Sequence, residues 1–186
     1  DFDDEGRQQV IDFVVDKYGK NQVAQIITYG SMAAKMSLRD VGRVLDIPLS
    51  EVNQVSKVFP DHLSATLNKV LADGGVEPKL LSKLNGEQKI NAEAFRKLAA
   101  NKDKIGEMIS GAKKLEGSIR STGVHACGVI ITPDDITKYI PMTVAKDSDL
   151  LLTQFDNSVV EKAGLLKMDF LGLKTLTIIK DAITII

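Results

Sequence analysis

The feature that most constrains the fold is a change in hydrophobic period close to Gly123. Between about 29 and 120, apolar residues recur every three or four positions in short segments that glycine or proline separates, which predicts helices. After Gly123, apolar residues run together or alternate, as they do in strands. A strand-like segment also precedes the helical section. The sequence therefore predicts an α+β protein in which helices interrupt a β-rich part.

The expected elements follow from these periods and from turn residues. The expected helices are 10–18, 32–45, 50–58, 65–71, 79–84, 91–100, one beginning after 103, and 174–186. The expected strands are 126–132, 150–155 and 165–170, and 22–28 is expected to be a short strand or an apolar connector. Side-chain oxygens can accept from the free N–H groups at a helix start. The expected N-caps are therefore Asp3 or Asp4, Ser31, Ser50, Asp103, and Asp156 for a short helix at 158–162.

Composition predicts a globular chain without a membrane partner. Of 186 residues, 44% are hydrophobic and 26% charged, which suits a domain with a real core. No apolar segment approaches the roughly 20 residues that span a bilayer. The single cysteine, Cys127, excludes an internal disulfide framework and favours a cytoplasmic location. Two histidines and one cysteine predict no zinc site. Because the chain starts at Asp1 in an acidic cluster, we expect a piece of a larger protein with a partial active site.

Charge is unevenly distributed along the chain. Residues 29–120 hold 15 Lys and Arg against 11 Asp and Glu, whereas the flanks together hold 9 against 14. A mildly basic middle section between acidic flanks suits a phosphate-facing module inserted into a metal-binding one. Ordinary variation between solvated surfaces remains the alternative explanation.

The segment from Leu165 to Leu173 resembles a buried strand but has a carboxylate, Asp169, at its centre. Because side chains alternate along a strand, Lys167 and Asp169 share one face. A carboxylate among packed apolar groups needs a cationic partner or a metal ion. Asp169 is therefore expected either to bind a metal ion or to pair with a neighbouring Lys or Arg.

The N-terminus shows a similar alternation, with Asp1 and Asp3 on one face. If this segment lies beside the strand at 165–170, Asp1 and Asp169 face the same space. Carboxylates without histidine or cysteine suit Mg²⁺, and two such ions serve phosphoryl transfer. Lys167 could then contact a triphosphate as a point charge.

Two further groups of residues suggest phosphate contacts. His125 lies among glycines and small residues before a strand, so it could contact a phosphate or serve a structural role. Lys35, Arg39 and Arg43 recur every fourth residue along one expected helix. This basic stripe could follow a nucleic-acid backbone, or it could be a solvated face.

A helix-turn-helix pattern overlaps this stripe. Residues 39–52 resemble such a motif, which leaves a non-catalytic helix-turn-helix DNA-binding module as the alternative function. Little at the start of its second helix is well suited to reading base edges, because Glu51, Asn53 and Gln54 are few and Lys57 comes late.

Taken together, the segments resemble the family C replicative DNA polymerases, the alpha subunits of bacterial DNA polymerase III. The segments that carry the resemblance are Asp1–Phe2 (as the end of the family's P-D-x-D-x-D-F motif), Ile26–Lys35, Arg39–Arg43, Lys114–Gly117, Gly123–Ile131, Thr153–Asp156 and Lys167–Leu173. They follow one another in the family's order over nearly the whole chain, with 60–101 matching loosely.

The resemblance implies a catalytic site that is only partly in this chain. Asp169 would be one of three catalytic aspartates that hold two Mg²⁺ ions. The other two would be the first acids of the P-D-x-D-x-D-F motif, upstream of Asp1, which makes Asp1 a second-shell residue. Lys167 and His125 would lie near the incoming dNTP, whereas Lys35, Arg39 and Arg43 would grip primer–template DNA.

The resemblance also implies a domain arrangement and a reaction. Residues 1–28 and 121–186 would be segments of a palm similar to that of the polymerase-beta nucleotidyltransferases, a small mixed sheet with helices. Residues 29–120 would be an all-helical thumb inserted between them. The parent would be a DNA-directed DNA polymerase that works with other replisome subunits such as the sliding clamp. The isolated chain is expected to be inactive.

Overall fold

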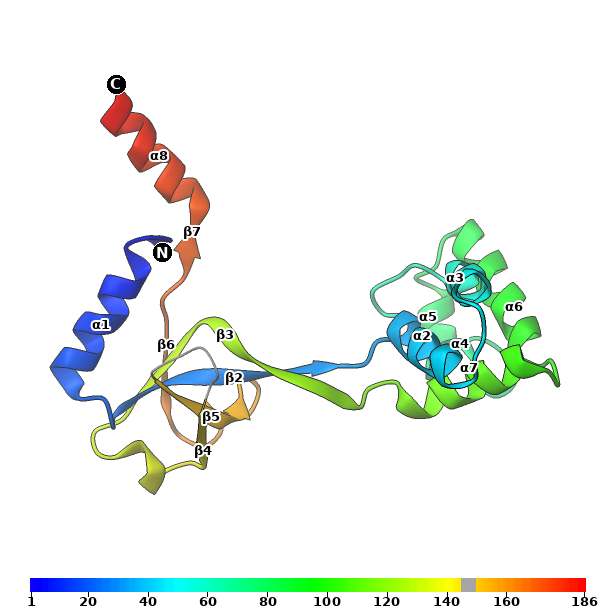
Figure 1. Cartoon of the computed structure of the whole chain (residues 1–186), viewed down its shortest axis with the longest axis horizontal. Coiled ribbons are helices and arrows are strands. Elements are labelled where there is room, and N and C mark those ends of the chain that lie inside the picture. The colour runs from blue at the N-terminus through cyan, green and yellow to red at the C-terminus, as the bar shows by residue number, and fades with distance from the viewer. Residues whose placement is uncertain (145–149) are drawn as a thin grey trace. The chain divides into compact units, whose positions relative to one another are not determined.

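The computed structural model describes residues 1–144 and 150–186. The chain folds into two compact units. One unit combines 1–30 with 121–186, and the other is 31–120 (Figure 1). The first contains a small mixed sheet with helices, and the second is built from helices. The predicted α+β class is confirmed.

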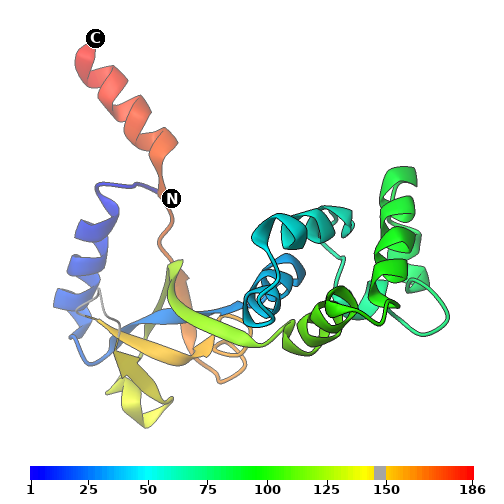
Figure 2. The same ribbon diagram turned by 45° about the vertical axis from the view of Figure 1, so that its right-hand side comes forward.

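A five-stranded sheet forms the centre of the first unit (Figure 2). Its strand order is β4-β5-β2-β3-β6, with β2 parallel to β5, and with β4–β5 and β3–β6 antiparallel. The strands are β2 Val23–Ser31, β3 Ile119–Ile131, β4 Met142–Val144, β5 Leu151–Asp156 and β6 Leu166–Asp169. A 3₁₀ turn, η1 Ile136–Lys138, follows β3. The sheet is therefore mixed, with β6 at one edge.

Both faces of the central strands are covered. The helix α1, Arg7–Tyr18, packs Ile11 and Val14 against Val23 of β2 and Val129 of β3. The next residues along these strands point to the opposite face, where Ala24, Ile26 and Ile130 pack with Ile136, Ile140 and Val160. This alternation follows from the period of two along a strand. It explains why β2 and β3 have continuous apolar runs.

The first residues of the chain pair with the segment before α8 in a short second sheet. The strand β1, Phe2–Asp3, pairs in parallel with β7, Gly172–Leu173. The Phe2 N–H donates to the Leu171 carbonyl at 2.8 Å, and the Phe2 ring lies 6.0 Å from that of Phe170. The helix α8, Lys174–Ile185, follows β7, and none of its residues is buried.

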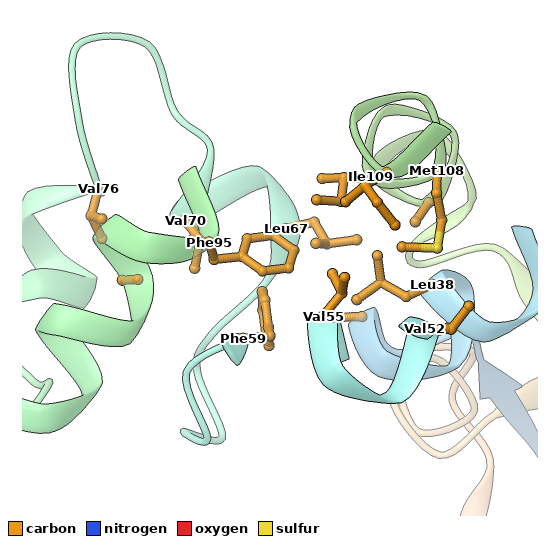
Figure 3. Packing of buried hydrophobic residues seen from close by; sticks show 14 of the residues in the cluster. Leu38, Val52, Val55, Phe59, Leu67, Val70, Val76, Phe95, Met108 and Ile109 are labelled. Carbon is orange, nitrogen blue, oxygen red and sulfur yellow. The ribbon is translucent and has the colours of Figure 1, made fainter. Parts of the chain in front are cut away.

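The second unit has its own apolar core (Figure 3). Leu38 and Met108 are fully buried in it, and the rings of Phe59 and Phe95 meet edge to face with centroids 5.1 Å apart. The helices are α2 Ala34–Val44, α3 Leu49–Val58, α4 Leu67–Val70, α5 Pro78–Leu81, α6 Gly86–Ala99 and α7 Lys104–Leu115.

Helix starts were predicted correctly only in part. Asp103 caps α7 and accepts from the Gly106 N–H at 2.9 Å, as predicted. Ser31 instead belongs to β2, and α2 begins after Ala33 without a side-chain cap. The residue before α1 is Gly6, whose N–H donates to Asp3 at 2.7 Å. Asp3 therefore closes the preceding turn instead of capping the helix. The predicted cap at Ser50 is also wrong, because α3 begins after Pro48.

The prediction of a buried strand at 165–170 was wrong in one respect. The strand β6 exists, but Leu166 is 61% and Met168 40% exposed. The reason is its position at the sheet edge, where β3 is its neighbour. The helix predicted at 158–162 is a series of turns instead. Asp156 accepts from the N–H and hydroxyl of Ser158 there, and the hydroxyl contact is the main cause that lowers the pKa of Asp156.

Across the described ranges, 1–144 and 150–186, no helix combines the length and apolar character needed to cross a bilayer.

Candidate functional site

The candidate site lies where the edge strand β6 ends beside β3. Asp169 is paired in register with Gly128, and Lys167 with Ile130. The Lys167 ammonium lies 3.2 Å from Asp169 Oδ2. The Lys167 side chain is 13% exposed and that of Asp169 is 52% exposed. Lys167, on the same strand face, is therefore a cationic partner of Asp169, and the carboxylate is half exposed to solvent.

Cys127 and His125 complete this site from β3. The Cys127 thiol donates to Asp169 Oδ1 at 3.5 Å, and its Sγ lies 3.6 Å from His125 Nδ1. Burial, followed by the contact with Asp169, raises the pKa of the Cys127 thiol. At neutral pH this group is therefore a thiol that donates to the carboxylate.

The backbone fixes the His125 ring. The N–H groups of Gly128 and Cys127 donate to Nδ1 at 2.9 and 3.3 Å. Because Nδ1 accepts, a neutral ring carries its proton on Nε2. A Cβ at Gly128 would lie 2.7 Å from Ile26 Cδ1 and 3.1 Å from His125 Nδ1. Glycine at this position thus leaves room for the imidazole.

The sequence predicted no zinc site from two histidines and one cysteine, and this stays a prediction, but one histidine and the cysteine do lie together with Asp169. Ligand atoms of His125, Cys127 and Asp169 all lie within 4.8 Å of one another. His125 and Cys127 are two residues apart on one strand, so the period of two could have indicated their common face. Asp169 joins them through the β3–β6 register, which the sequence pattern does not reveal.

Arg7 is a residue at this site that sequence reasoning missed. Its Nε donates to the Phe170 carbonyl at 2.6 Å, directly after Asp169. A charge-assisted hydrogen bond of this kind holds the end of β6 against the start of α1. A lone arginine near a helix start offers no sequence signal for such a role.

The described residues do not by themselves fit a site for two Mg²⁺ ions. The described group that can hold a metal at β6 contains one carboxylate, together with a thiol and an imidazole. Mg²⁺ prefers oxygen ligands. Asp1 precedes β1, which pairs with β7, and it is exposed and not a member of that group. Its second-shell role stays a prediction.

The basic stripe lies on α2 and already has polar partners. Lys35 pairs with Asp61 at 3.0 Å, and Arg43 with Asp40 at 3.3 Å. Arg39 donates to the Asn53 side chain on α3 at 3.4 Å. Surface ion pairs contribute at most about 1 kcal/mol, so these cations can exchange such partners for phosphates.

The α2–α3 pair has the order of a helix-turn-helix motif. The turn between the helices contains Asp46 with φ 53°, a left-handed conformation that is uncommon outside glycine. The first turn of α3 carries the exposed Glu51, which repels DNA phosphates. The order of the helices thus permits the motif, whereas Glu51 disfavours the approach of α3 to the DNA backbone.

Comparison with known proteins identifies the family. The protein-family model described as the bacterial DNA polymerase III alpha NTPase domain matches residues 1–172 of the chain. The chain belongs to this family. The description names an NTPase domain and mentions neither a palm nor a thumb.

The relatives found are alpha subunits of DNA polymerase III. The chain is 48% identical over 172 residues to that of Chlamydia trachomatis, covering 92% of this chain and 12% of the relative. It is 43% identical over 186 residues to that of Escherichia coli K12, covering 100% of this chain and 14% of the relative. The chain thus spans about one eighth of these proteins.

Proposed function

We propose that this chain is the palm-and-thumb part of a replicative, DNA-directed DNA polymerase. In this proposal, 1–28 and 121–186 contribute to a polymerase-beta-like palm, and 29–120 is the thumb. Family membership supports the polymerase assignment. The observation that carries the catalytic part is the half-exposed Asp169 carboxylate at the end of an edge strand, with the Lys167 ammonium 3.2 Å away.

The parent protein would transfer a nucleotidyl group from a dNTP to a primer 3′-hydroxyl and release pyrophosphate. Two bound Mg²⁺ ions would supply charge neutralisation at the reacting phosphate. Asp169 is proposed as the ligand that this chain contributes, and the remaining carboxylates would come from the rest of the polymerase. The isolated chain would then be inactive.

Lys167 and His125 are proposed to contact the triphosphate. The Lys167 ammonium is held next to Asp169 by a flexible stem, so it can turn toward a phosphate as a point charge. His125 keeps its Nδ1 on backbone donors, which leaves Nε2–H to donate to a phosphate oxygen. Both residues would bind and orient the dNTP without forming covalent bonds to it.

The basic stripe on α2 is proposed to grip primer–template DNA. Arg39 and Arg43 are exposed, and their contacts with Asn53 and Asp40 are weak surface contacts that DNA phosphates can replace. Contacts of this type bind the backbone irrespective of sequence and weaken steeply with salt. We also propose that the parent works with other replisome subunits, such as the sliding clamp, and that it lies in the cytoplasm.

The catalytic proposal is tested by primer extension with the longer polymerase that contains this chain. Loss of an outer-shell partner of a metal ligand lowers activity roughly 10- to 100-fold. Because Asp169 is proposed as a ligand itself, Asp169→Asn should lower extension by at least about 100-fold. Asp134→Asn, a surface aspartate paired with Lys138, is the matched control and should extend normally. Near-normal extension by Asp169→Asn would remove Asp169 from catalysis.

DNA binding separates the polymerase from the helix-turn-helix alternative. The polymerase proposal predicts that the 186-residue chain binds duplexes of different sequence with similar, salt-sensitive affinity. A helix-turn-helix module would instead prefer one sequence, and Arg43→Ala would relax that preference.

A further inference from the structure

We propose that His125, Cys127 and Asp169 form a binding site for a thiophilic divalent cation, with Zn²⁺ as the probe. This site goes beyond the Mg²⁺ chemistry of the proposed polymerase. It places a thiol, an imidazole and a carboxylate together at the boundary between β3 and β6, with their ligand atoms all within 4.8 Å of one another.

Two of the three spacings between the ligand atoms, those from the cysteine sulfur, fit a tetrahedral zinc site. Zinc binds sulfur at about 2.3 Å and nitrogen or oxygen at about 2.0–2.2 Å. At tetrahedral angles, these bond lengths put sulfur about 3.6 Å from either of the other ligand atoms. Cys127 Sγ lies 3.6 Å from His125 Nδ1 and 3.5 Å from Asp169 Oδ1. The cysteine already has both spacings that a shared cation requires.

The two oxygens of Asp169 have separate neighbours. Oδ1 faces the Cys127 thiol, whereas Oδ2 pairs with the Lys167 ammonium at 3.2 Å. A cation can therefore bind Oδ1 while Lys167 stays on Oδ2 and orients the carboxylate, as outer-shell partners of metal ligands do. Because Asp169 is 52% exposed, the fourth position is open to a water molecule.

Cation binding replaces hydrogen bonds at Cys127 and His125 with bonds to the metal. The Cys127 thiol releases its proton to solvent and forms a sulfur–metal bond. The cation replaces the backbone N–H groups of Cys127 and Gly128 as the partner of the Nδ1 lone pair. Thiolate and imidazole ligands favour Zn²⁺ over Mg²⁺, which prefers oxygen.

Occupation of this site would compete with the polymerase reaction. A thiophilic cation that holds Asp169 removes the carboxylate proposed to bind Mg²⁺, so Zn²⁺ would inhibit the enzyme. This consequence rests on the proposed function, whereas the cation site itself does not.

The test uses Co²⁺, a spectroscopic substitute for Zn²⁺, with the reduced 186-residue chain. We expect a thiolate-to-cobalt charge-transfer band that disappears when Zn²⁺ displaces Co²⁺. Cys127→Ser should lose the band, and His125→Ala and Asp169→Asn should weaken Zn²⁺ binding by at least about tenfold. His62→Ala removes the other histidine and is the matched control with unchanged binding. Circular dichroism checks that each variant is folded.

Two outcomes would overturn the site: absence of the charge-transfer band, or equal Zn²⁺ affinity in the wild type and folded Cys127→Ser. Both concern binding alone, so they are independent of polymerase activity. Normal extension by Asp169→Asn in the longer protein would contradict the proposed function and leave the cation site standing.

Discussion

Replacement of Phe95 by alanine tests whether the second unit folds around the core in Figure 3. Phe95 is fully buried and meets the Phe59 ring edge to face at 5.1 Å. Truncation of a buried phenylalanine costs about 3–5 kcal/mol, because contacts are lost and a cavity remains. A unit of this size is stable by roughly 5–15 kcal/mol. Phe95→Ala should therefore remove a large share of its stability.

Urea unfolding followed by circular dichroism measures this loss. With a slope of about 2 kcal/mol per molar urea, a loss of about 4 kcal/mol lowers the midpoint by about 2 M. Leu63→Ala is the control, because Leu63 is fully exposed and its truncation should change stability by less than about 0.5 kcal/mol. Equal midpoints for the two variants would refute the assignment of Phe95 to the core.

Three further predictions concern packing, pH and DNA binding. Gly42→Ala should destabilise the chain by about 1–3 kcal/mol, partly offset by helix propensity, because its Cβ would lie 2.6 Å from Val52 Cγ2. Gly86→Ala, whose Cβ meets nothing within 4 Å, should not destabilise it in the same urea assay. The Lys138 ammonium, and after it the Asp135 N–H, lowers the pKa of Asp134 below its ordinary value of 3.8. The contact with Lys138 therefore stabilises the fold above pH 3.8, and this stabilisation is lost as the pH falls through the lowered pKa. Lys138→Ala should raise the pKa of Asp134 in an NMR titration, and an unchanged value would contradict the contact. Arg43→Ala should reduce the salt slope of duplex binding by about 1 for all sequences, and an unchanged slope would remove Arg43 from the phosphate contacts.

Local sequence signals predicted much of the secondary structure. Asp103 marks the start of α7, because a capping side chain acts within one turn. Ser31 failed as a cap because the sheet continues through it, and pairing between distant strands overrides a local preference. The exposure of Leu166 and Met168 was missed for a similar reason, since a strand's position in its sheet is not written in its own residues.

The candidate site could be predicted only where one strand carries it. Lys167 and Asp169 share a face of β6, and the ion pair between them was one of the alternatives that the sequence left open. The approach of Cys127 to Asp169 depends on the antiparallel register of β3 and β6. The Arg7 contact depends on α1 lying beside the end of β6. Such placements follow from tertiary packing, for which one sequence carries no periodic signal.

The central claim, that Asp169 acts in nucleotidyl transfer, is tested most directly by single-turnover incorporation of one nucleotide by the longer polymerase over a range of dNTP concentrations. Asp169→Asn should lower the maximum rate by at least about 100-fold. Lys167→Ala should chiefly raise the dNTP concentration that gives half the maximum rate, since a phosphate contact contributes binding. An unchanged maximum rate in folded Asp169→Asn would contradict the account.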